Sequence, residues 1–484
     1  MTRQPATDPL PQRVHLVGIG GAGLSGLARV LQSAGHRVSG TDRSESSSLE
    51  ALRDLEIGVE VGESRAEWLA ADVECVVHSA AIDADDPQLE LARERGLRTL
   101  KYAQTLPLLA GPDRLLGVAG THGKTTTSWM LWNAVDGTGD VTGGPLPGAL
   151  IGGISRRLGT NALAGSADGL FVVEACEYDK SFLNLAPHGA IVTNVEADHL
   201  DSYGSLEAIH EAFGEFAGSV HEDGLLVVGE AVPESVEERA RCEVWRLGRE
   251  LQVQLAGESL GRFRFRLQGP GFETPELALV VPGRFNVENA AQALALAVGL
   301  ARRTNSNAGE CARAAVRGLA RFQGVFRRFE TWGVLGRIDV VHDYAHHPTE
   351  VAAVIEAARR RFPRRKLFVL FQPHQHSRTA RFLSEFVESL RGADSVFVTD
   401  VYGARSETRG EQRAGASDLV TGLRRAGVEA EESGNLERAT FRFVHSISSP
   451  SVALVIGAGD VEEIKHDLLH ELALRSARTS GPIT

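Results

Sequence analysis

Cysteine is scarce in this chain of 484 residues, which contains four cysteines and no pair in the Cys-x-x-Cys spacing. A disulfide framework or a structural zinc site is therefore not indicated. Long apolar runs are also missing, because no stretch approaches the ~20 residues that a membrane-spanning helix needs. The first residues lack the apolar centre of a signal peptide. We therefore expect a cytoplasmic protein without a membrane partner.

An excess of basic residues is absent as well. The chain has 51 lysine and arginine residues against 63 aspartate and glutamate residues, which gives a formal net charge of −12. Nonspecific nucleic-acid binding needs a basic face, so we expect no nucleic-acid partner. Anionic ligands must instead be held by local groups such as glycine loops and helix N-termini. The length predicts about three domains, and the sequence leaves the oligomeric state open.

The strongest positive feature is the stretch LLGVAGTHGKTTTSWM at residues 115–130. An apolar run ends at Gly120, and a helix-compatible segment begins at Lys124. A loop of this kind points backbone N–H groups at one spot, where the helix N-terminus and a lysine add positive charge. The hydroxyl of Thr125 can hold a phosphate-bound Mg²⁺ there. The stretch predicts binding of a nucleoside triphosphate, although Val118 stands where the general pattern has glycine.

A second glycine-rich turn, Gly18-Ile19-Gly20-Gly21-Ala22-Gly23, follows a predicted strand near the N-terminus. The next predicted strand ends at Asp42, and a third is expected at residues 74–78. Strand, glycine turn and helix form the first unit of a dinucleotide-type fold, in which a carboxylate about 20 residues later meets a ribose. We predict a Rossmann-like domain at residues 1–112. NAD(P) and a nucleotide sugar share the pyrophosphate and the ribose, so the glycines leave both ligands open.

Acidic residues follow two predicted strands of the central part of the chain. The strands at residues 169–175 and 190–195 end near Glu174 and near Asp198-His199. In a parallel sheet these ends line the ligand crevice, so they are expected to face the phosphate loop. Carboxylate oxygen and imidazole suit Mg²⁺ or Mn²⁺ beside a triphosphate.

The pattern of the chain changes twice beyond these strands. Short β runs between residues 224 and 282 predict an antiparallel excursion. A third α/β domain is predicted at residues 331–484, which leaves residues 113–330 to the central domain. The predicted strands of this third domain lie at residues 337–343, 366–371, 395–399 and 452–456.

Five histidines at two of these strand ends raise a zinc hydrolase as an alternative. Pro348 suits the first turn of a helix, so His342 precedes that helix and does not share a helical face with His346. A zinc site would also leave the phosphate loop unexplained. We therefore do not favour a zinc enzyme.

Motifs in all three parts of the chain resemble those of the Mur ligases, which assemble the peptidoglycan stem peptide. The resemblance implies three α/β domains: a Rossmann-like domain for the UDP of UDP-N-acetylmuramate, a P-loop ATPase-like domain with a mostly parallel sheet for Mg-ATP, and a Rossmann-like domain for L-alanine. It implies an amide-forming ligase that works through an acyl phosphate in peptidoglycan precursor synthesis. The motifs are GIGGAGLSGLA, AGTHGKTTT, EACEYD, NVEADHLDSY, GRFNVENA, GVFRRFE, HDYAHHPTE, FQPHQHSRT and GAGDV.

The resemblance also implies roles for individual residues. ATP would contact Gly120, Thr121, His122, Gly123, Lys124, Thr125, Thr126, Asn289 and Asp343. Mg²⁺ or Mn²⁺ would be ligated by Thr125, Glu174 and His199. The substrates would be bound by Gly18, Gly20, Gly21, Gly23, Asp42, Ser79, Tyr344, His346 and Arg378. Catalysis would depend on Lys124, His199, Arg328 and His346, and the base that deprotonates the amine stays open.

The chain departs from the family pattern mainly at the substrate end. Many members read DDY where this chain has His342-Asp343-Tyr344, arginine and tyrosine where Gln375 and His376 stand, and EADESD for EACEYD. The missing arginine at Gln375 leaves the strictness of selection among L-alanine, glycine and L-serine open, and we predict L-alanine as the preferred acceptor. Two alternatives remain: a ligase that recycles murein tripeptide and, from a different class, an NAD(P)-binding oxidoreductase or nucleotide sensor.

Overall fold

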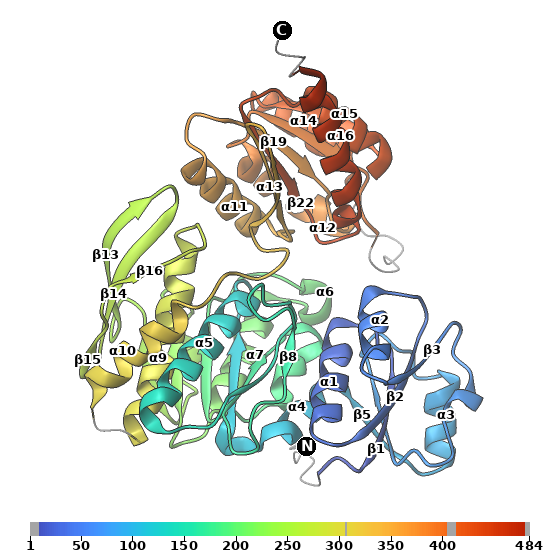
Figure 1. Ribbon diagram of the computed structural model, residues 1–484, viewed down its shortest axis with the longest axis vertical. Helices are drawn as coiled ribbons and strands as arrows, with labels where there is room; N and C mark the ends of the chain where they lie inside the picture. The colour runs from blue at the N-terminus through green and yellow to red at the C-terminus, as the bar shows by residue number, and fades with distance from the viewer. Residues whose placement is uncertain (1–8, 305–306, 404–412, 480–484) are drawn as a thin grey trace. The chain divides into compact units, whose positions relative to one another are not determined.

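The computed structural model describes residues 9–304, 307–403 and 413–479 (Figure 1). These residues form two compact units. The first unit comprises Met1–Leu255, Phe265–Leu277 and Glu288–Gln323, and the second comprises Ala256–Arg264, Ala278–Val287 and Gly324–Thr484. Within the described ranges, no helix combines the length and the apolar character that crossing a membrane requires.

The first sheet of the first unit has five parallel strands in the order β3-β2-β1-β4-β5. The direction of strand order reverses beside β1, and such a switch point is where open parallel sheets bind ligands. The predicted third strand is in fact β4, because the short edge strand β3 precedes it. The sequence did not predict β3, because its side chains are at most half-buried and form no apolar run. The strands are β1 (Arg13–Val17), β2 (Arg37–Asp42), β3 (Gly58–Val61), β4 (Cys75–His78) and β5 (Arg98–Lys101), and the helices are α1 (Ala22–Ser33), α2 (Ser47–Arg53), α3 (Pro87–Glu94) and α4 (Tyr102–Ala110).

The second sheet has seven strands in the order β12-β11-β10-β6-β9-β7-β8 and is parallel except for β8. Its central strands are buried on both faces, which explains why β6 and β10 read as continuous apolar runs. The strands are β6 (Leu115–Ala119), β7 (Gly148–Leu150), β8 (Ala162–Leu163), β9 (Phe171–Glu174), β10 (Gly189–Val192), β11 (Leu225–Val228) and β12 (Glu243–Arg246).

Helices flank this sheet, and two of them approach each other closely. Helix α5 follows the phosphate loop and packs on α10, where a Cβ on Gly137 would lie 2.6 Å from the Cα of Gly318. Only glycine permits that approach. The helices are α5 (Lys124–Thr142), α6 (Leu200–Tyr203), α7 (Leu206–Gly218), α8 (Glu234–Glu237), α9 (Phe285–Thr304) and α10 (Ala308–Leu319).

The predicted antiparallel excursion exists, but it begins later than expected. Strands β11 and β12 still belong to the parallel sheet, and the separate four-stranded sheet starts at β13. Strand β14 alternates exposed arginines with buried Phe263, Phe265 and Leu267, as a strand with one solvated face does. The strands are β13 (Gln252–Ser259), β14 (Arg262–Gly269), β15 (Phe272–Glu273) and β16 (Leu277–Ala278).

The second unit contains a six-stranded sheet in the order β17-β18-β22-β19-β20-β21, parallel except for the edge strand β17. The four strands predicted here are present, and β17 and β21 were missed. The strands are β17 (Glu330–Leu335), β18 (Ile338–Asp343), β19 (Lys366–Phe371), β20 (Ser395–Thr399), β21 (Glu429–Gly434) and β22 (Ser451–Ile456). The helices are α11 (Pro348–Arg361), α12 (His376–Arg381), α13 (Leu383–Leu390), α14 (Ala416–Arg425), α15 (Leu436–Ser446) and α16 (Lys465–Thr479).

Candidate active site

The phosphate loop connects β6 to α5, as the sequence predicts. Gly120 has a φ of +141° and Gly123 a φ of +82°, conformations that side chains rarely adopt. A Cβ on Gly120 would collide with Thr193, and one on Gly123 would lie 2.9 Å from Oδ1 of Asn289. Both glycines are therefore required by the fold, and the predicted ATP contact Asn289 lies against the loop.

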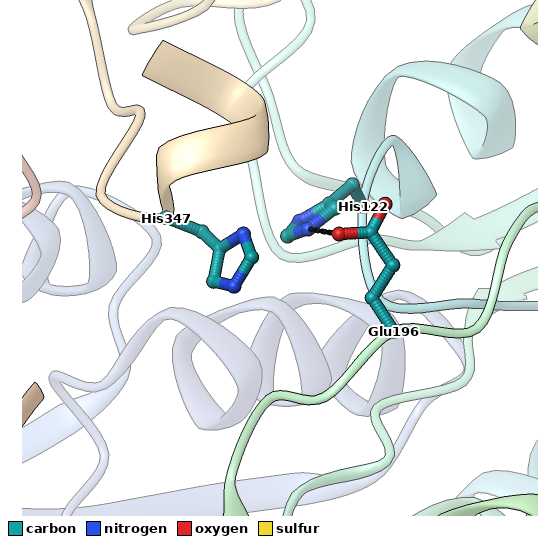
Figure 2. Close-up of side chains that lie close together, drawn as sticks. All are labelled: His122, Glu196 and His347. Atoms are coloured by element: carbon teal, nitrogen blue, oxygen red, sulfur yellow. Dashed lines mark ion pairs between the residues drawn. The ribbon is translucent and has the colours of Figure 1, made fainter. Parts of the chain in front are cut away.

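The loop that follows β10 holds the phosphate loop in shape. The backbone N–H of His122 donates to Oδ1 of Asn194 at 2.8 Å, and the hydroxyl of Thr193 donates to the carbonyl of His122 at 2.7 Å. The backbone N–H of Thr121 donates to the carbonyl of Asn194 at 3.0 Å. Nε2 of His122 lies 3.5 Å from Oε2 of Glu196, an ion pair when the imidazole is protonated (Figure 2). The sequence placed the acids of this strand end, Glu196 among them, toward the phosphate loop, but it assigned no supporting role to Thr193 or Asn194.

Lys124 begins α5 and folds back over the loop. Its ammonium donates to the carbonyls of Gly120 at 2.6 Å and Thr121 at 2.9 Å. It also lies 2.9 Å from Oε2 of Glu177. Burial alone would lower the pKa of Lys124, but the neighbouring Glu177, Cys176 and Glu174 together outweigh it, and the pKa lies above its ordinary value. The lysine is therefore a charged group at the phosphate loop, as predicted.

Two of the three predicted metal ligands are in direct contact. The hydroxyl of Thr125 donates to Glu174, with Oε1 at 3.1 Å and Oε2 at 3.0 Å. The backbone N–H of Gly152 donates to the same carboxylate at 2.8 Å and fixes it. Hydroxyl and carboxylate oxygens form a donor set that suits a hard cation such as Mg²⁺. Thr126, also predicted to contact ATP, follows in the first turn of α5 and is half-buried.

The third predicted metal ligand, His199, has a left-handed backbone with φ of 52° directly before α6. Its Nε2 lies 3.7 Å from Oε1 of Glu177 and 3.8 Å from Oδ2 of Asp198. Glu177 therefore contacts both His199 and Lys124. Sequence reasoning did not assign Glu177 a role, although its place three residues after Glu174, in the same acidic strand end, was an available signal.

A cavity of about 260 Å³ joins the first glycine turn to the end of β9. Of the predicted substrate residues, Gly18, Gly21, Gly23 and Ser79 line it. The same cavity is also lined by Glu174, which ends β9, by Cys176 and Tyr178, which follow it, and by Lys101 and Tyr102. The five-stranded and the seven-stranded parts of the first unit thus line one cavity.

Gly20 and Asp42 do not line this cavity. Oδ2 of Asp42 accepts a hydrogen bond from the backbone N–H of Gly20 at 2.8 Å, and Oδ1 accepts one from the N–H of Arg43 at 2.8 Å. The Asp42 carboxylate thus fixes the glycine turn in this structure. Its predicted contact with a ribose stays a prediction.

Within the second unit, Asp343 ends β18 and is buried. Its carboxylate accepts hydrogen bonds from the backbone N–H groups of Phe329 at 2.7 Å and Ala345 at 2.8 Å. Burial, opposed by Arg328, raises its pKa to about 6. The guanidinium of Arg328 lies 3.5 Å from Oε1 of Glu350. Asp343 and Arg328 therefore belong to one charged cluster at the end of β18.

The residues predicted at the amino-acid end are partly brought together. The ring centroids of Tyr344 and His346 lie 5.5 Å apart, and that of His374 lies 5.7 Å beyond His346. Nδ1 of His346 lies 3.1 Å from the carbonyl of Tyr344. Arg378 lies in α12 and is half-buried. Nδ1 of its neighbour His376 lies 3.0 Å from the carbonyl of Ala414, which makes that imidazole part of the local fold.

His347 is the residue that caps the N-terminus of α11. Pro348 occupies the first turn of this helix, so His342 lies on β18 and not on the helix, as predicted. Figure 2 draws His347 at the helix start.

Three family descriptions match successive parts of the chain. The description "Mur ligase family, catalytic domain" matches residues 13–114, "Mur ligase middle domain" residues 118–297, and "Mur ligase, glutamate ligase domain" residues 327–459. The chain belongs to the Mur ligase family. The predicted boundaries at 112 and 330 stay predictions.

Relatives in the Mur ligase family cover almost the full chain. The UDP-N-acetylmuramate–L-alanine ligase of Renibacterium salmoninarum is 39% identical over 475 residues, 97% of each chain. The structure of the UDP-N-acetylmuramate-alanine ligase of Thermotoga maritima matches with a TM-score of 0.76 and 27% identity, covering 96% of this chain and 99% of that one. A murein peptide ligase of Psychrobacter arcticus matches with a TM-score of 0.66, covering 96% of this chain and 99% of that one. At 22% identity this match shows a shared fold alone.

Proposed function

We propose that this chain is an ATP-dependent ligase that joins L-alanine to the muramyl carboxylate of UDP-N-acetylmuramate. The observation that carries the proposal is the cavity that runs from the glycine turn at Gly18 to Glu174, beside the phosphate loop. A nucleotide sugar bound at the glycine turn would direct its carboxylate toward a triphosphate held by that loop. The relatives at 39% identity carry the corresponding name.

The proposed reaction has two steps. An oxygen of the muramyl carboxylate attacks the γ-phosphorus of ATP, and the bond from that phosphorus to the leaving oxygen of ADP breaks. The amine nitrogen of L-alanine then attacks the acyl carbon, and phosphate leaves with the carboxylate oxygen that attacked first. The ammonium of L-alanine must lose protons to a base or to solvent before and during the second step. Negative charge accumulates on the phosphoryl group and later on the acyl oxygen, so cationic groups are needed there.

The residues of the first unit suit these needs. Lys124 is a charged ammonium at the phosphate loop. The oxygen pair of Thr125 and Glu174 fits Mg²⁺ or Mn²⁺, and we propose that these two residues hold it together with His199. When bound, the metal would neutralise phosphate charge. For Arg328, Asp343, Tyr344, His346 and Arg378 we retain the roles that the family resemblance implies.

One assay separates L-alanine ligation from its nearest alternative. Purified protein is mixed with UDP-N-acetylmuramate, Mg-ATP and L-alanine, glycine, L-serine or murein tripeptide, and the amide product is identified by mass while ADP is counted. We expect L-alanine to give the highest kcat/KM. Preference for the tripeptide would move the protein to the recycling branch.

Calorimetry tests the alternative from a different enzyme class. The protein is titrated with UDP-N-acetylmuramate, NADH and NADPH in separate experiments. Among these three ligands we expect binding of the UDP sugar alone, because only this ligand carries a carboxylate that the cavity would lead from the glycine turn toward Glu174 and the phosphate loop. Tight NADH binding would contradict the proposal.

A further inference from the structure

The ammonium of Lys124 is fully occupied by the protein. An ammonium has three N–H donors. The three acceptors are the carbonyl of Gly120 at 2.6 Å, the carbonyl of Thr121 at 2.9 Å and Oε1 of Glu177 at 3.0 Å. The side chains of Lys124 and Glu177 are only 13% and 6% exposed. A phosphate oxygen can therefore reach this ammonium only if one of the three acceptors gives it up.

Glu177 is held in place independently of Lys124. Its backbone carbonyl accepts a hydrogen bond from the hydroxyl of Tyr203 at 2.6 Å. Its Oε1 also lies 3.7 Å from Nε2 of His199. The carboxylate therefore keeps its position and a polar neighbour when Lys124 moves away, and it stays available for the lysine to return.

The carboxylate is the acceptor that matters for phosphate binding. The carbonyls of Gly120 and Thr121 belong to the phosphate loop and are neutral, whereas Glu177 carries a full negative charge. Charge-assisted hydrogen bonds are about twice as strong as neutral ones. A buried carboxylate beside a triphosphate also repels it.

We propose that Glu177 competes with the nucleotide phosphates for Lys124. It holds the lysine when the loop is empty, releases it when the triphosphate binds and takes it back as ADP leaves. Glu177 is thus a positioning residue that acts through Lys124. The inference rests on the proposed function in one respect, that the phosphate loop binds ATP.

The substitution Glu177→Gln tests the competition, because glutamine keeps the shape and removes the charge. The matched control is Asp179→Asn, an acid two residues away that lies 3.0 Å from Lys101 and is 46% exposed. Calorimetry with Mg-ADP and a non-hydrolysable Mg-ATP analogue, without UDP sugar, gives the Kd of each variant. Thermal unfolding confirms that each variant is folded.

We expect Glu177→Gln to bind the ATP analogue roughly tenfold tighter than the wild type, the size expected for removing one competing charge-assisted hydrogen bond. The Kd for Mg-ADP should fall as well, and Asp179→Asn should leave both Kd values unchanged. A residue with a purely structural role would not tighten binding when it is replaced.

Other results overturn the inference in distinguishable ways. If the folded variant binds the analogue with unchanged or weaker affinity while the wild type binds it normally, the competition is wrong and the proposed function stands. If the wild type binds no nucleotide, the proposed function fails and the inference fails with it.

Discussion

The hydroxyl of Thr125 lies 3.0 Å from Oε2 of Glu174 and joins the first turn of α5 to the end of β9. The two residues are 49 positions apart in the chain. They meet because β6 and β9 are parallel neighbours whose carboxyl ends share one edge of the sheet. This contact places an acidic oxygen next to the phosphate loop, where the proposed metal would bind.

Glu174→Gln should reduce Mg²⁺-dependent kcat by about 100-fold or more, because it removes the charge of a proposed metal ligand and keeps its shape. The rate of ADP formation is measured over a Mg²⁺ titration. The thermal midpoint should change little, since the amide can still accept from Thr125. Full activity of the wild type after exhaustive chelation, without added metal, would contradict the metal site.

Lys124→Ala should lower turnover by roughly 10²–10³-fold, because it removes a cation that acts on the transferring phosphoryl group. It also leaves Glu177 buried without its ammonium, which costs stability. The double variant Lys124→Ala/Glu177→Gln should therefore recover thermal stability but not turnover. ADP release and thermal unfolding measure the two effects separately, and wild-type turnover in Lys124→Ala would remove the lysine from the mechanism.

Arg378→Ala should raise the KM for L-alanine by roughly 10-fold or more, since a guanidinium pairs with a free carboxylate. Affinity for ATP should be nearly unchanged. The control is Arg381→Ala, which removes an exposed arginine from the same helix, α12. Steady-state kinetics with varied L-alanine and then varied ATP separates the two constants, and equal effects of the two substitutions would argue against a specific contact.

The sequence predicts the position of the phosphate loop between strand and helix well and the residues that support the loop poorly. Lys124, Thr125 and Glu174 follow from strand, loop and helix patterns that are local in the chain. The position of Glu177 in the acidic strand end was a signal that the residue lies near the loop, but its contact with Lys124 could not be predicted, because Asp179 and Lys180 beside it have φ of 53°, a conformation that no pattern in their residue types indicates.

Other misses have the same kind of cause. The carboxylate of Asp42 accepts from the backbone of Gly20, a tertiary contact that the spacing of the glycines does not reveal and that leaves the predicted ribose contact untested. Strands β11 and β12 were read as part of an antiparallel excursion, since a short apolar run does not show which strand it pairs with.

His342 stands where many family members have aspartate, and its burial predicts a pH effect. It is fully buried on β18 with its ring 4.6 Å from that of Trp332. Burial first, then Arg327 and Lys465, lower its pKa to about 3. In the unfolded chain its pKa is about 6.5. The unfolded state therefore binds the additional proton between these values, and the free energy of unfolding falls as the pH falls through that window.

His342→Leu should remove this effect. From about pH 7 to about pH 4, the free energy of unfolding should fall by roughly 1–3 kcal/mol less in the variant than in the wild type. Asp343, with its pKa raised to about 6, acts in the opposite direction, and it is present in both proteins, so it cancels in the comparison. Denaturant unfolding at several pH values measures the difference. Parallel pH curves would show that His342 does not titrate as described.

The transfer of oxygen tests the central claim most directly. UDP-N-acetylmuramate labelled with ¹⁸O in its carboxylate is incubated with Mg-ATP, L-alanine and the enzyme, and the phosphate released is analysed by mass. An acyl phosphate requires one carboxylate oxygen to leave with each phosphate, so we expect one ¹⁸O per phosphate from fully labelled substrate. Unlabelled phosphate formed together with the amide product would contradict the account.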